Sequence, residues 1–256
     1  MTKEKILGYL GTEAALRLTL LSETDSTNTR LKLMAQQGAA EGTVLIADSQ
    51  TAGRGRLGRS FSSPGGEGIY LSMLLKAESE TLMTLTPRAA VAVCRAIESL
   101  CAVRCGIKWV NDVLINERKI CGILTEFDAE SGFVIIGVGI NVNNREFPPE
   151  IENVASSILL RTGERLSRSA LAAAVIRELD RACASRNTDL SGCLREYRDR
   201  CVNVGRRCFI LRGQEKTPVQ VLGVNDDFTL SVLHSDGRTQ ALSAGEVSLR
   251  GIEGYV

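Results

Sequence analysis

The chain has 256 residues, of which 44% are hydrophobic and 24% are charged, and its formal net charge at pH 7 is +1. This length fits one large domain or one domain with a small module, and the apolar content allows an ordinary globular core. A charge so near zero argues against a general nucleic-acid binder, which needs a broad basic excess.

Signals for export, membrane insertion and metal binding are missing from the sequence. The N-terminus has no apolar core followed by a small-residue cleavage site, and no apolar run approaches the roughly 18 residues of a membrane span. The eight cysteines include no CxxC pair, and His234 is the single histidine. We therefore expect reduced thiols in a cytoplasmic protein rather than a zinc site or a Ser-His-Asp or Cys-His enzyme.

The first half of the chain shows strands and helices around a glycine-rich loop. DSTN at 25–28 precedes LKLMAQQG, which predicts a short helix with a polar cap and a stop at Gly38. TVLIAD at 43–48 and GIYLSMLL at 68–75 predict strands. Thr86-Pro87 is expected to open a long helix, because proline suits a first helical turn.

Three apolar runs follow, and a predicted helix comes after them. The runs are IKWV at 107–110, ICGILTEF at 120–127 and FVIIGVGINV at 133–142, with NERK at 116–119 predicted as a hairpin connection between the first two. SALAAAVIRELDRACAS at 169–185 predicts an amphipathic helix.

Beyond about residue 201, five short strands are expected in roughly 50 residues, which is typical of a small antiparallel barrel. The runs that suggest it include RCFIL, TPVQVLGV, FTLSVL and EVSLR. The sequence thus predicts a mixed α+β domain over residues 1–200 and a small β module over residues 201–256.

The run GRGRLGR at 53–59 sets three arginines among glycines, with no acidic residue between Gly53 and Gly66. Guanidinium groups match phosphate or carboxylate oxygens, and glycine lets the backbone approach a ligand closely. The run therefore indicates a loop that closes over an anionic small molecule. Its GxGxxG spacing also fits a dinucleotide fingerprint, but RSFSSPGGEG at 59–68 cannot begin the helix which that fingerprint requires. A solvated basic loop without a task is the other alternative.

Two further motifs carry polar groups beside apolar strands. KWVND at 108–112 combines a cation, an aromatic ring, an amide and a carboxylate, and Lys119 precedes the apolar run that follows. Lys119 could reach a carboxylate or phosphate in a pocket, or only cap a surface hairpin, and Asp112 could be a turn residue. GVGIN at 137–141 allows close approach to the backbone, or is an ordinary buried strand with glycine bends.

Taken together and in this order, the motifs resemble those of biotin–protein ligases over roughly residues 20–256. They are DSTN, QTAGRGRLGR, SPGG, KWVND, RKICGILTE and GVGIN, with GEVSLR at 245–250 similar to the end of that family's C-terminal module. The resemblance implies a mixed sheet with flanking helices, like class II aminoacyl-tRNA synthetases, and a small C-terminal SH3-like barrel. It also implies condensation of biotin with ATP to biotinyl-5′-AMP, with Mg²⁺ carried on the phosphates.

The acceptor implied by the resemblance is a lysine on a biotin carboxyl carrier protein or domain of a carboxylase. Residues implied to bind biotin are Ser26, Thr27, Asn28, Gln50, Gly53, Arg54, Gly55, Arg56, Lys119 and Gly122. Those implied at ATP or the adenylate are Arg54, Arg56, Arg59, Phe61, Asn111, Lys119 and Asn141. The implied catalytic groups are Lys119, Arg54, Arg56 and Asp112, with Asp112 either assisting magnesium or favouring the neutral acceptor lysine.

Three alternatives and two partner predictions complete the sequence interpretation. A lipoate–protein ligase shares the adenylation logic, a biotin-binding regulator could keep the pocket without catalysis, and a dehydrogenase is disfavoured. Only 24 residues precede Asp25, so the DNA-binding module of some relatives is not expected. A homodimer through exposed strand edges is possible on the sequence, and neither DNA nor membrane is an expected partner.

Overall fold

The computed structural model describes residues 1–11, 17–76, 82–183, 190–244, 248–252 and 254–256, which form two β-sheets with helices around the larger one. The elements, in chain order, are α1 (Lys3–Leu10), β1 (Leu18–Thr24), α2 (Thr27–Gln36), β2 (Val44–Gln50), the 3₁₀ turn η2 (Arg56–Gly58), β3 (Ile69–Lys76), α3 (Leu82–Glu98), β4 (Gly106–Lys108), β5 (Asp112–Ile115), β6 (Arg118–Asp128), β7 (Phe133–Ile140), α4 (Ile158–Thr162), α5 (Arg168–Cys183), α6 (Leu190–Arg200), β8 (Arg207–Arg212), β9 (Glu215–Val224), β10 (Leu230–His234), β11 (Thr239–Leu242) and β12 (Ser248–Gly251).

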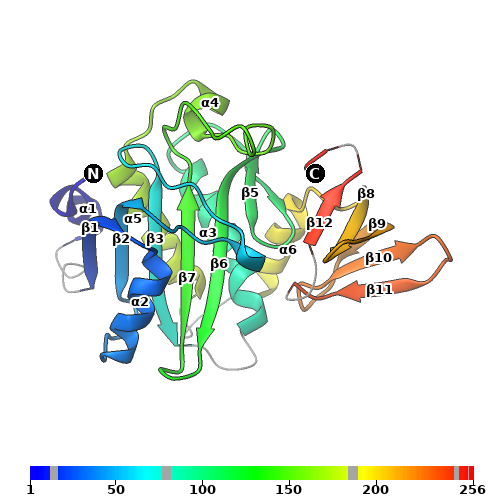
Figure 1. Cartoon of the computed structure of the whole chain (residues 1–256), viewed down its shortest axis with the longest axis horizontal. Helices are drawn as coiled ribbons and strands as arrows, with labels where there is room; N and C mark the ends of the chain where they lie inside the picture. Colours follow the sequence, from blue (N-terminus) through cyan, green and yellow to red (C-terminus); the bar gives the residue numbers. More distant parts are fainter. Residues whose placement is uncertain (12–16, 77–81, 184–189, 245–247, 253) are drawn as a thin grey trace.

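The large sheet is mixed, with strand order β1-β2-β3-β7-β6-β5-β4. Only β1 and β2 run parallel, and the other neighbours are antiparallel. Helices α3 and α5 cover one face of the sheet, and α2 lies on the opposite face (Figure 1). The fold is therefore α+β with a mixed sheet and flanking helices, as the sequence predicts.

Alternate residues of the strands point either to the main core or to the face of the sheet that carries α2. Because successive side chains point to opposite faces of a strand, Ile46 and Met73 enter the main core, whereas Leu45 and Leu74 pack with Leu31 of α2. Farther along β3 and β7, beside the start of α2, this face carries Ser72, Gly137 and Gly139 instead of large apolar side chains. The side chains of Asn28 and Phe61 pack over the two glycines.

The predicted strands around the glycine-rich loop are confirmed as β2 and β3, but two helix starts are wrong. Helix α2 begins at Thr27, so the expected cap residues partly belong to the helix. Helix α3 begins at Leu82 and holds Pro87 inside it. A proline in a helix removes one backbone hydrogen bond, and the burial of Leu85 in the main core favours the longer helix despite that loss.

The predicted hairpin around NERK is also corrected. Strand β5 lies between the two apolar runs and pairs with both β4 and β6. The turn is tighter than expected: only Asn116 and Glu117 form it, with φ values of 46° and 63°, and Lys119 already belongs to β6. The sequence analysis missed β5, as well as α1, β1, α4 and α6.

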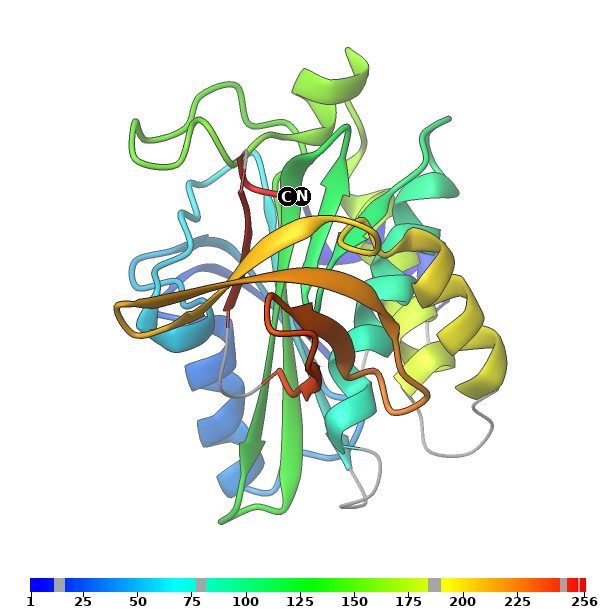
Figure 2. The ribbon, with the colours of Figure 1, turned by 90° about the vertical axis from the view of Figure 1, so that its right-hand side faces the viewer.

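The second sheet is antiparallel, with strand order β11-β10-β9-β8-β12, and it stands beside the β5 end of the large sheet (Figure 2). The Trp109 indole donates a hydrogen bond of 2.9 Å to the carbonyl of Phe228. The ring of Tyr197 packs edge-on against Phe228, with centroids 5.5 Å apart. These buried contacts fix the C-terminal sheet against the KWVND segment.

Two sequence expectations extend beyond the described residues. The first three residues of GEVSLR, 245–247, lie outside them, and so does the end of the predicted 169–185 helix after residue 183. Within the described chain, none of the helices combines the length and apolar character that crossing a bilayer requires.

Candidate functional site

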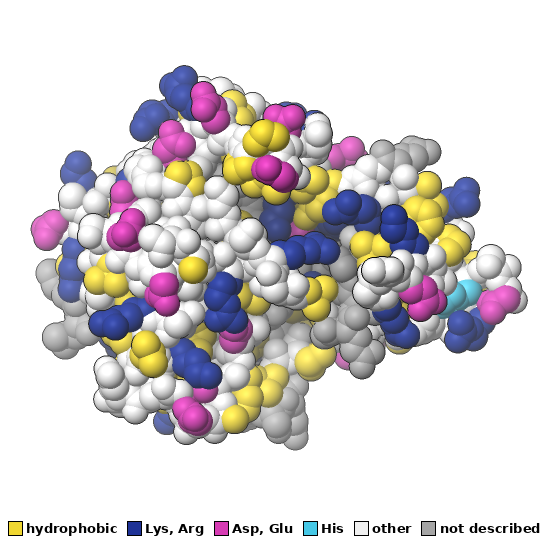
Figure 3. All heavy atoms as spheres, viewed as in Figure 1, with side chains coloured by type: hydrophobic (Ala, Val, Ile, Leu, Met, Phe, Trp, Pro, Cys, Tyr) yellow, Lys and Arg dark blue, Asp and Glu magenta, His cyan; other side chains and the backbone are white. Residues whose placement is uncertain are grey.

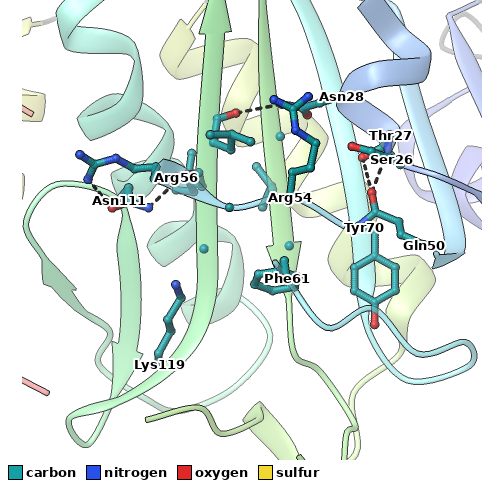
Figure 4. Close-up of a pocket in the computed structure, with 17 residues that line it drawn as sticks. Ser26, Thr27, Asn28, Gln50, Arg54, Arg56, Phe61, Tyr70, Asn111 and Lys119 are labelled. Atoms are coloured by element: carbon teal, nitrogen blue, oxygen red, sulfur yellow. Dashed lines mark hydrogen bonds between the residues drawn. The ribbon is translucent and has the colours of Figure 1, made fainter. Parts of the chain in front are cut away.

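A first cavity lies on the α2 face of the large sheet (Figure 4). Its walls come from the start of α2, the end of β2, the Arg-rich loop, and strands β6 and β7. The lining residues are Ser26, Thr27, Asn28, Gln50, Arg54, Gly55, Arg56, Phe61, Tyr70, Asn111, Lys119, Gly122, Ile123, Leu124, Gly137, Val138 and Gly139.

Buried amides and hydroxyls hold one side of this cavity in a fixed pattern. The backbone amide and hydroxyl of Thr27 donate to the Gln50 side-chain oxygen at 2.8 and 3.1 Å. The Gln50 amide in turn donates to the Ser63 hydroxyl at 2.8 Å. Figure 4 shows Ser26 and Thr27 beside Gln50 on this side. Such a network orients donors and acceptors for a small polar ring.

Asn28 joins this network to the strands. Its side-chain oxygen accepts a bond of 2.6 Å from the hydroxyl of Ser72, which is fully buried on β3. Its amide donates to the Glu126 carboxylate at 2.8 Å. Asn28 therefore keeps one orientation at the floor of the cavity.

Glycines make room for the cavity. A Cβ atom built on Gly137 would lie 2.2 Å from the Asn28 side-chain oxygen, and one on Gly139 would lie 2.6 Å from the Phe61 ring. A Cβ on Gly122 would lie 3.2 Å from the Lys119 side chain. Larger residues at these positions would push side chains of the site away, so GVGIN is more than an ordinary strand with glycine bends.

The Arg-rich loop crosses the cavity and connects three parts of the fold. Arg54 donates to Glu126 on β6 at 2.5 Å. Arg56 donates to the Asn111 side chain at 3.0 Å and also to the carbonyl of Ala244 in the C-terminal sheet. The loop turns sharply at Leu57, which has a φ of 55°. It is therefore a structured loop with bonded arginines rather than a solvated basic segment.

A second cavity of about 350 Å³ adjoins the first and shares Gly55, Arg56, Phe61, Asn111 and Lys119 with it. It lies where the large sheet meets the C-terminal sheet, and Figure 3 shows Lys and Arg side chains gathered in that hollow. The cationic residues that line it are Arg56, Arg59, Lys108, Lys119 and Arg250. This excess of positive charge suits a ligand with several phosphate oxygens.

Asp112 is a partly buried carboxylate among these cations. Lys119 Nζ lies 2.7 Å from one of its oxygens, and the Tyr255 hydroxyl donates to the other. Burial alone would raise the pKa of Asp112, but Lys119 and the Tyr255 hydrogen bond outweigh it and hold that pKa below its ordinary value. Asp112 is therefore an ionised carboxylate at neutral pH.

Lys108 adds a second buried cation. Its ammonium lies over the Tyr255 ring, 3.4 Å from the centroid, and the residue is only 4% exposed. Burial lowers the pKa of Lys108 to about 8, although Asp112 opposes that shift.

The structure brings the sequence-predicted site residues together with one exception. Gly53 lines neither cavity. It is the buried first residue of the Arg-rich loop, and a Cβ there would lie 2.4 Å from the Phe61 carbonyl oxygen. Asn141 lines the second cavity, although its amide donates to the Ser156 carbonyl. The sequence analysis missed Tyr70, Ser72, Glu126 and Tyr255. Ser72 could have been found as the single polar residue in the apolar run GIYLSMLL, whereas no sequence pattern pointed to Tyr255.

The donor set does not favour a metal held by the protein. The described residues include no group of three or more His, Cys, Asp or Glu side chains placed to share an ion. Asp112 has both oxygens engaged and has cations beside it.

Known proteins resemble this chain in sequence and in fold. The sequence pattern of the Biotin/lipoate A/B protein ligase family matches residues 20–143. The biotin–[acetyl-CoA-carboxylase] ligase of Mycobacterium tuberculosis is 33% identical over 238 residues, which cover 90% of this chain and 88% of that protein. The bifunctional ligase/repressor BirA of Bacillus spizizenii is 45% identical over 143 residues, or 53% of this chain. The match spans 44% of the Bacillus protein, less than half its length.

A solved structure extends the likeness to three dimensions. Biotin protein ligase from Aquifex aeolicus in complex with biotin and ATP superposes with a TM-score of 0.81 and 31% identity. The superposition covers 92% of this chain and 99% of that one. With matches that span nearly all of both partners in sequence and in structure, the chain belongs to the biotin–protein ligase family.

Proposed function

We propose that the chain joins biotin to a lysine of a biotin carboxyl carrier protein or domain, through biotinyl-5′-AMP. The observation that carries this proposal is the pair of adjoining cavities that meet at Arg56 and Lys119. One is small and lined by fixed amides and hydroxyls, and the other is larger and cationic. Biotin in the first and ATP in the second would bring the carboxylate and the α-phosphorus together at the shared residues.

In the first step, a biotin carboxylate oxygen forms a bond to the α-phosphorus, and pyrophosphate leaves with the electron pair of the broken P–O bond. Two anions must approach each other, so fixed cations lower the barrier where charge develops. Lys119 holds the biotin carboxylate and an α-phosphate oxygen. Arg56 and Arg59 neutralise the other oxygens, and Mg²⁺ travels with ATP. Arg54 joins them when it leaves Glu126.

The first cavity binds the biotin ureido ring. Ser26, Thr27 and Gln50 supply its hydrogen bonds, and Asn28 completes the polar side. Gly137 and Gly139, which lie under Asn28 and Phe61, leave room for the flat apolar body of the ligand to lie along the strand once the loop has opened. Phe61 lies beside the adenine, which Asn111 and Asn141 help to seat.

In the second step, the acceptor amine attacks the biotinyl carbonyl carbon. A C–N bond forms, the C–O bond to phosphate breaks, and AMP leaves with the electron pair. The incoming lysine is an ammonium ion in water and must give up a proton to the solvent before it attacks. Asp112 offers the carboxylate that receives and orients that ammonium, while nearby Lys108 and Lys119 favour its neutral form.

Replacing Gly137 with alanine is expected to weaken biotin binding about tenfold, because a displaced side chain in a packed site costs on the order of 1–3 kcal/mol. The new methyl group would force Asn28 from its position. Titration calorimetry with biotin measures the effect. Gly223→Ala is the matched control, since Gly223 also lies in a strand and a Cβ there meets nothing within 4 Å. Equal affinity in both variants would remove Asn28 from the biotin site.

Closure of the Arg-rich loop is expected to protect it from trypsin. The first cavity measures about 50 Å³, far below the roughly 300 Å³ of small ligand pockets, so the loop has to open for biotin to enter. Arg54 and Arg59 are exposed. Cleavage within residues 53–66 should slow when biotin and ATP are added, because the adenylate holds the loop over itself. A cleavage rate that both ligands leave unchanged would contradict this closure.

The decisive test is biotin-dependent exchange of labelled pyrophosphate into ATP. Exchange with biotin but not with lipoate is the expected result, and it identifies an adenylating biotin ligase. Exchange with lipoate alone would assign the site to lipoate. Tight biotin binding without any exchange would make the chain a biotin-binding regulator.

Finer features remain predictions of the same proposal. Residues 201–256 would form a separate module whose antiparallel sheet closes into an SH3-like barrel, after a ligase domain over residues 1–200. Seven of the eight cysteines are buried, which fits reduced thiols in a cytoplasmic protein. A homodimer and a lack of DNA binding stay predictions for solution measurements.

A further inference from the structure

The Tyr255 hydroxyl is hydrogen-bonded to Asp112, the carboxylate that the proposed second step uses. Its hydroxyl donates to one oxygen of Asp112, and Lys119 lies 2.7 Å from the other. Its ring lies under the ammonium of Lys108 and forms part of the wall of the second cavity. Both oxygens of Asp112 therefore have partners before any acceptor arrives.

Gly251, at the end of β12, lets residues 254–256 reach this position. A Cβ on Gly251 would lie 1.9 Å from the carbonyl oxygen of Val256. No real side chain tolerates that distance, so the contact with Val256 exists only because position 251 is glycine. Gly254, in contrast, has open space where a Cβ would be.

We propose that Tyr255 is a gate for the acceptor: its hydroxyl takes the place at Asp112 of the acceptor lysine's ammonium group, and docking of the carrier domain displaces residues 254–256. This inference rests on the proposed function. In the resting protein the gate keeps Asp112 occupied. Once the gate leaves, Asp112 is open toward the carrier domain, and Lys119 stays at its other oxygen.

The chemistry around Asp112 favours an amine as the group that replaces the phenol. A phenol O–H and an ammonium N–H both donate to a carboxylate oxygen, so one can substitute for the other. A divalent ion would bring two positive charges next to Lys108 and Lys119, which repel it. Burial and the nearby Asp112 charge raise the pKa of Tyr255, so its hydroxyl remains a donor at neutral pH.

The gate predicts that the two reaction steps respond differently to its removal. Tyr255→Phe keeps the ring over Lys108 but removes the hydroxyl bond to Asp112, and Gly251→Ala displaces the whole segment from a position outside both cavities. Protein loaded with biotinyl-5′-AMP is mixed with a limiting concentration of a purified biotin carboxyl carrier domain. We expect both variants to transfer biotin about fivefold faster, as one lost hydrogen bond allows. Pyrophosphate exchange is measured on the same variants, so that the change in transfer is expressed relative to the change in the first step.

A second measurement follows the segment itself. Hydrogen–deuterium exchange of residues 254–256 in the loaded protein should rise when the carrier domain is added, because docking releases them. Gly254→Ala is the matched control and should behave as the unaltered chain in every assay.

The results separate the gate from the proposed function. If the unaltered chain performs no biotin-dependent pyrophosphate exchange, the proposed function fails. If it does, but transfer by Tyr255→Phe is unchanged or slower, Tyr255 is a support for Asp112 and the gate is wrong. Unchanged deuterium exchange at residues 254–256 on addition of the carrier domain would overturn it as well.

Discussion

Lys119→Ala is expected to lower biotin-dependent pyrophosphate exchange by about 10²- to 10³-fold, the usual loss when one charge-stabilising group is removed from a transition state. Lys119 lies on β6 at the junction of the two cavities, and its ammonium is the cation bonded to Asp112. The nearest arginines of the loop are held by other partners in this structure, Arg56 by Asn111 and Ala244 and Arg54 by Glu126.

The fold should survive this substitution. Lys119 holds its strand through the backbone, by pairing with Leu114 and by donating to the carbonyl of Val154. Thermal melting of the variant should therefore show one cooperative transition. Lys32→Ala removes an equally charged but half-exposed partner of Asp128 that lines neither cavity, and it serves as the matched control. Normal exchange in a folded Lys119→Ala protein would exclude Lys119 from the chemistry.

The part of the site that follows from local sequence was predictable. The apolar runs TVLIAD and GIYLSMLL predicted β2 and β3 correctly on either side of the loop. Through the resemblance to biotin–protein ligases, the order of the motifs predicted many of the residues that line the two cavities, although each motif taken alone fitted an ordinary helix cap, turn or strand. What made them informative was their conjunction, because a shared ligand constrains residues that are distant in the chain.

The remainder depends on contacts that no local pattern encodes. Strand β5 has four residues, and its turn uses Asn116 and Glu117 with positive φ, so it resembled a polar connection. Pro87 suited a first turn by its own preference, but the burial of Leu85 extended the helix before it. Tyr255 meets Asp112 across 143 positions of sequence. Such a pairing arises only when the C-terminal sheet stands beside the large one.

Replacement of Lys108 is expected to have the second large effect, a rise in the free energy of unfolding. Burial lowers its pKa from 10.5 to about 8, which corresponds to about 3 kcal/mol of unfavourable free energy when the side chain is charged in the folded protein. Replacing it with methionine also removes the interaction with the Tyr255 ring, worth about 1 kcal/mol. We therefore expect Lys108→Met to raise the free energy of unfolding at pH 7 by about 2 kcal/mol.

The expected gain from Lys108→Met changes with pH, because the folded and unfolded chains release the Lys108 proton at different pH values. Below pH 8 both the folded and the unfolded chain carry the proton on Lys108, so the folded protein bears the full cost of burying the charge. Between about pH 8 and 10.5 the folded form loses that proton and the unfolded form keeps it. The unfolded state then binds more protons, and stability rises with pH. The advantage of methionine should accordingly shrink over this range and disappear above it.

Urea denaturation at several pH values measures the difference, with Lys216→Met as the control on the exposed surface of β9. A gain that does not change with pH would mean that the pKa of Lys108 is the same in the folded and the unfolded chain. A protein that keeps so costly a cation beside Asp112 gains something other than stability from it. In the proposed reaction, the charge of Lys108 favours the neutral acceptor amine at Asp112, so the stabilised methionine variant should be the slower one in biotin transfer.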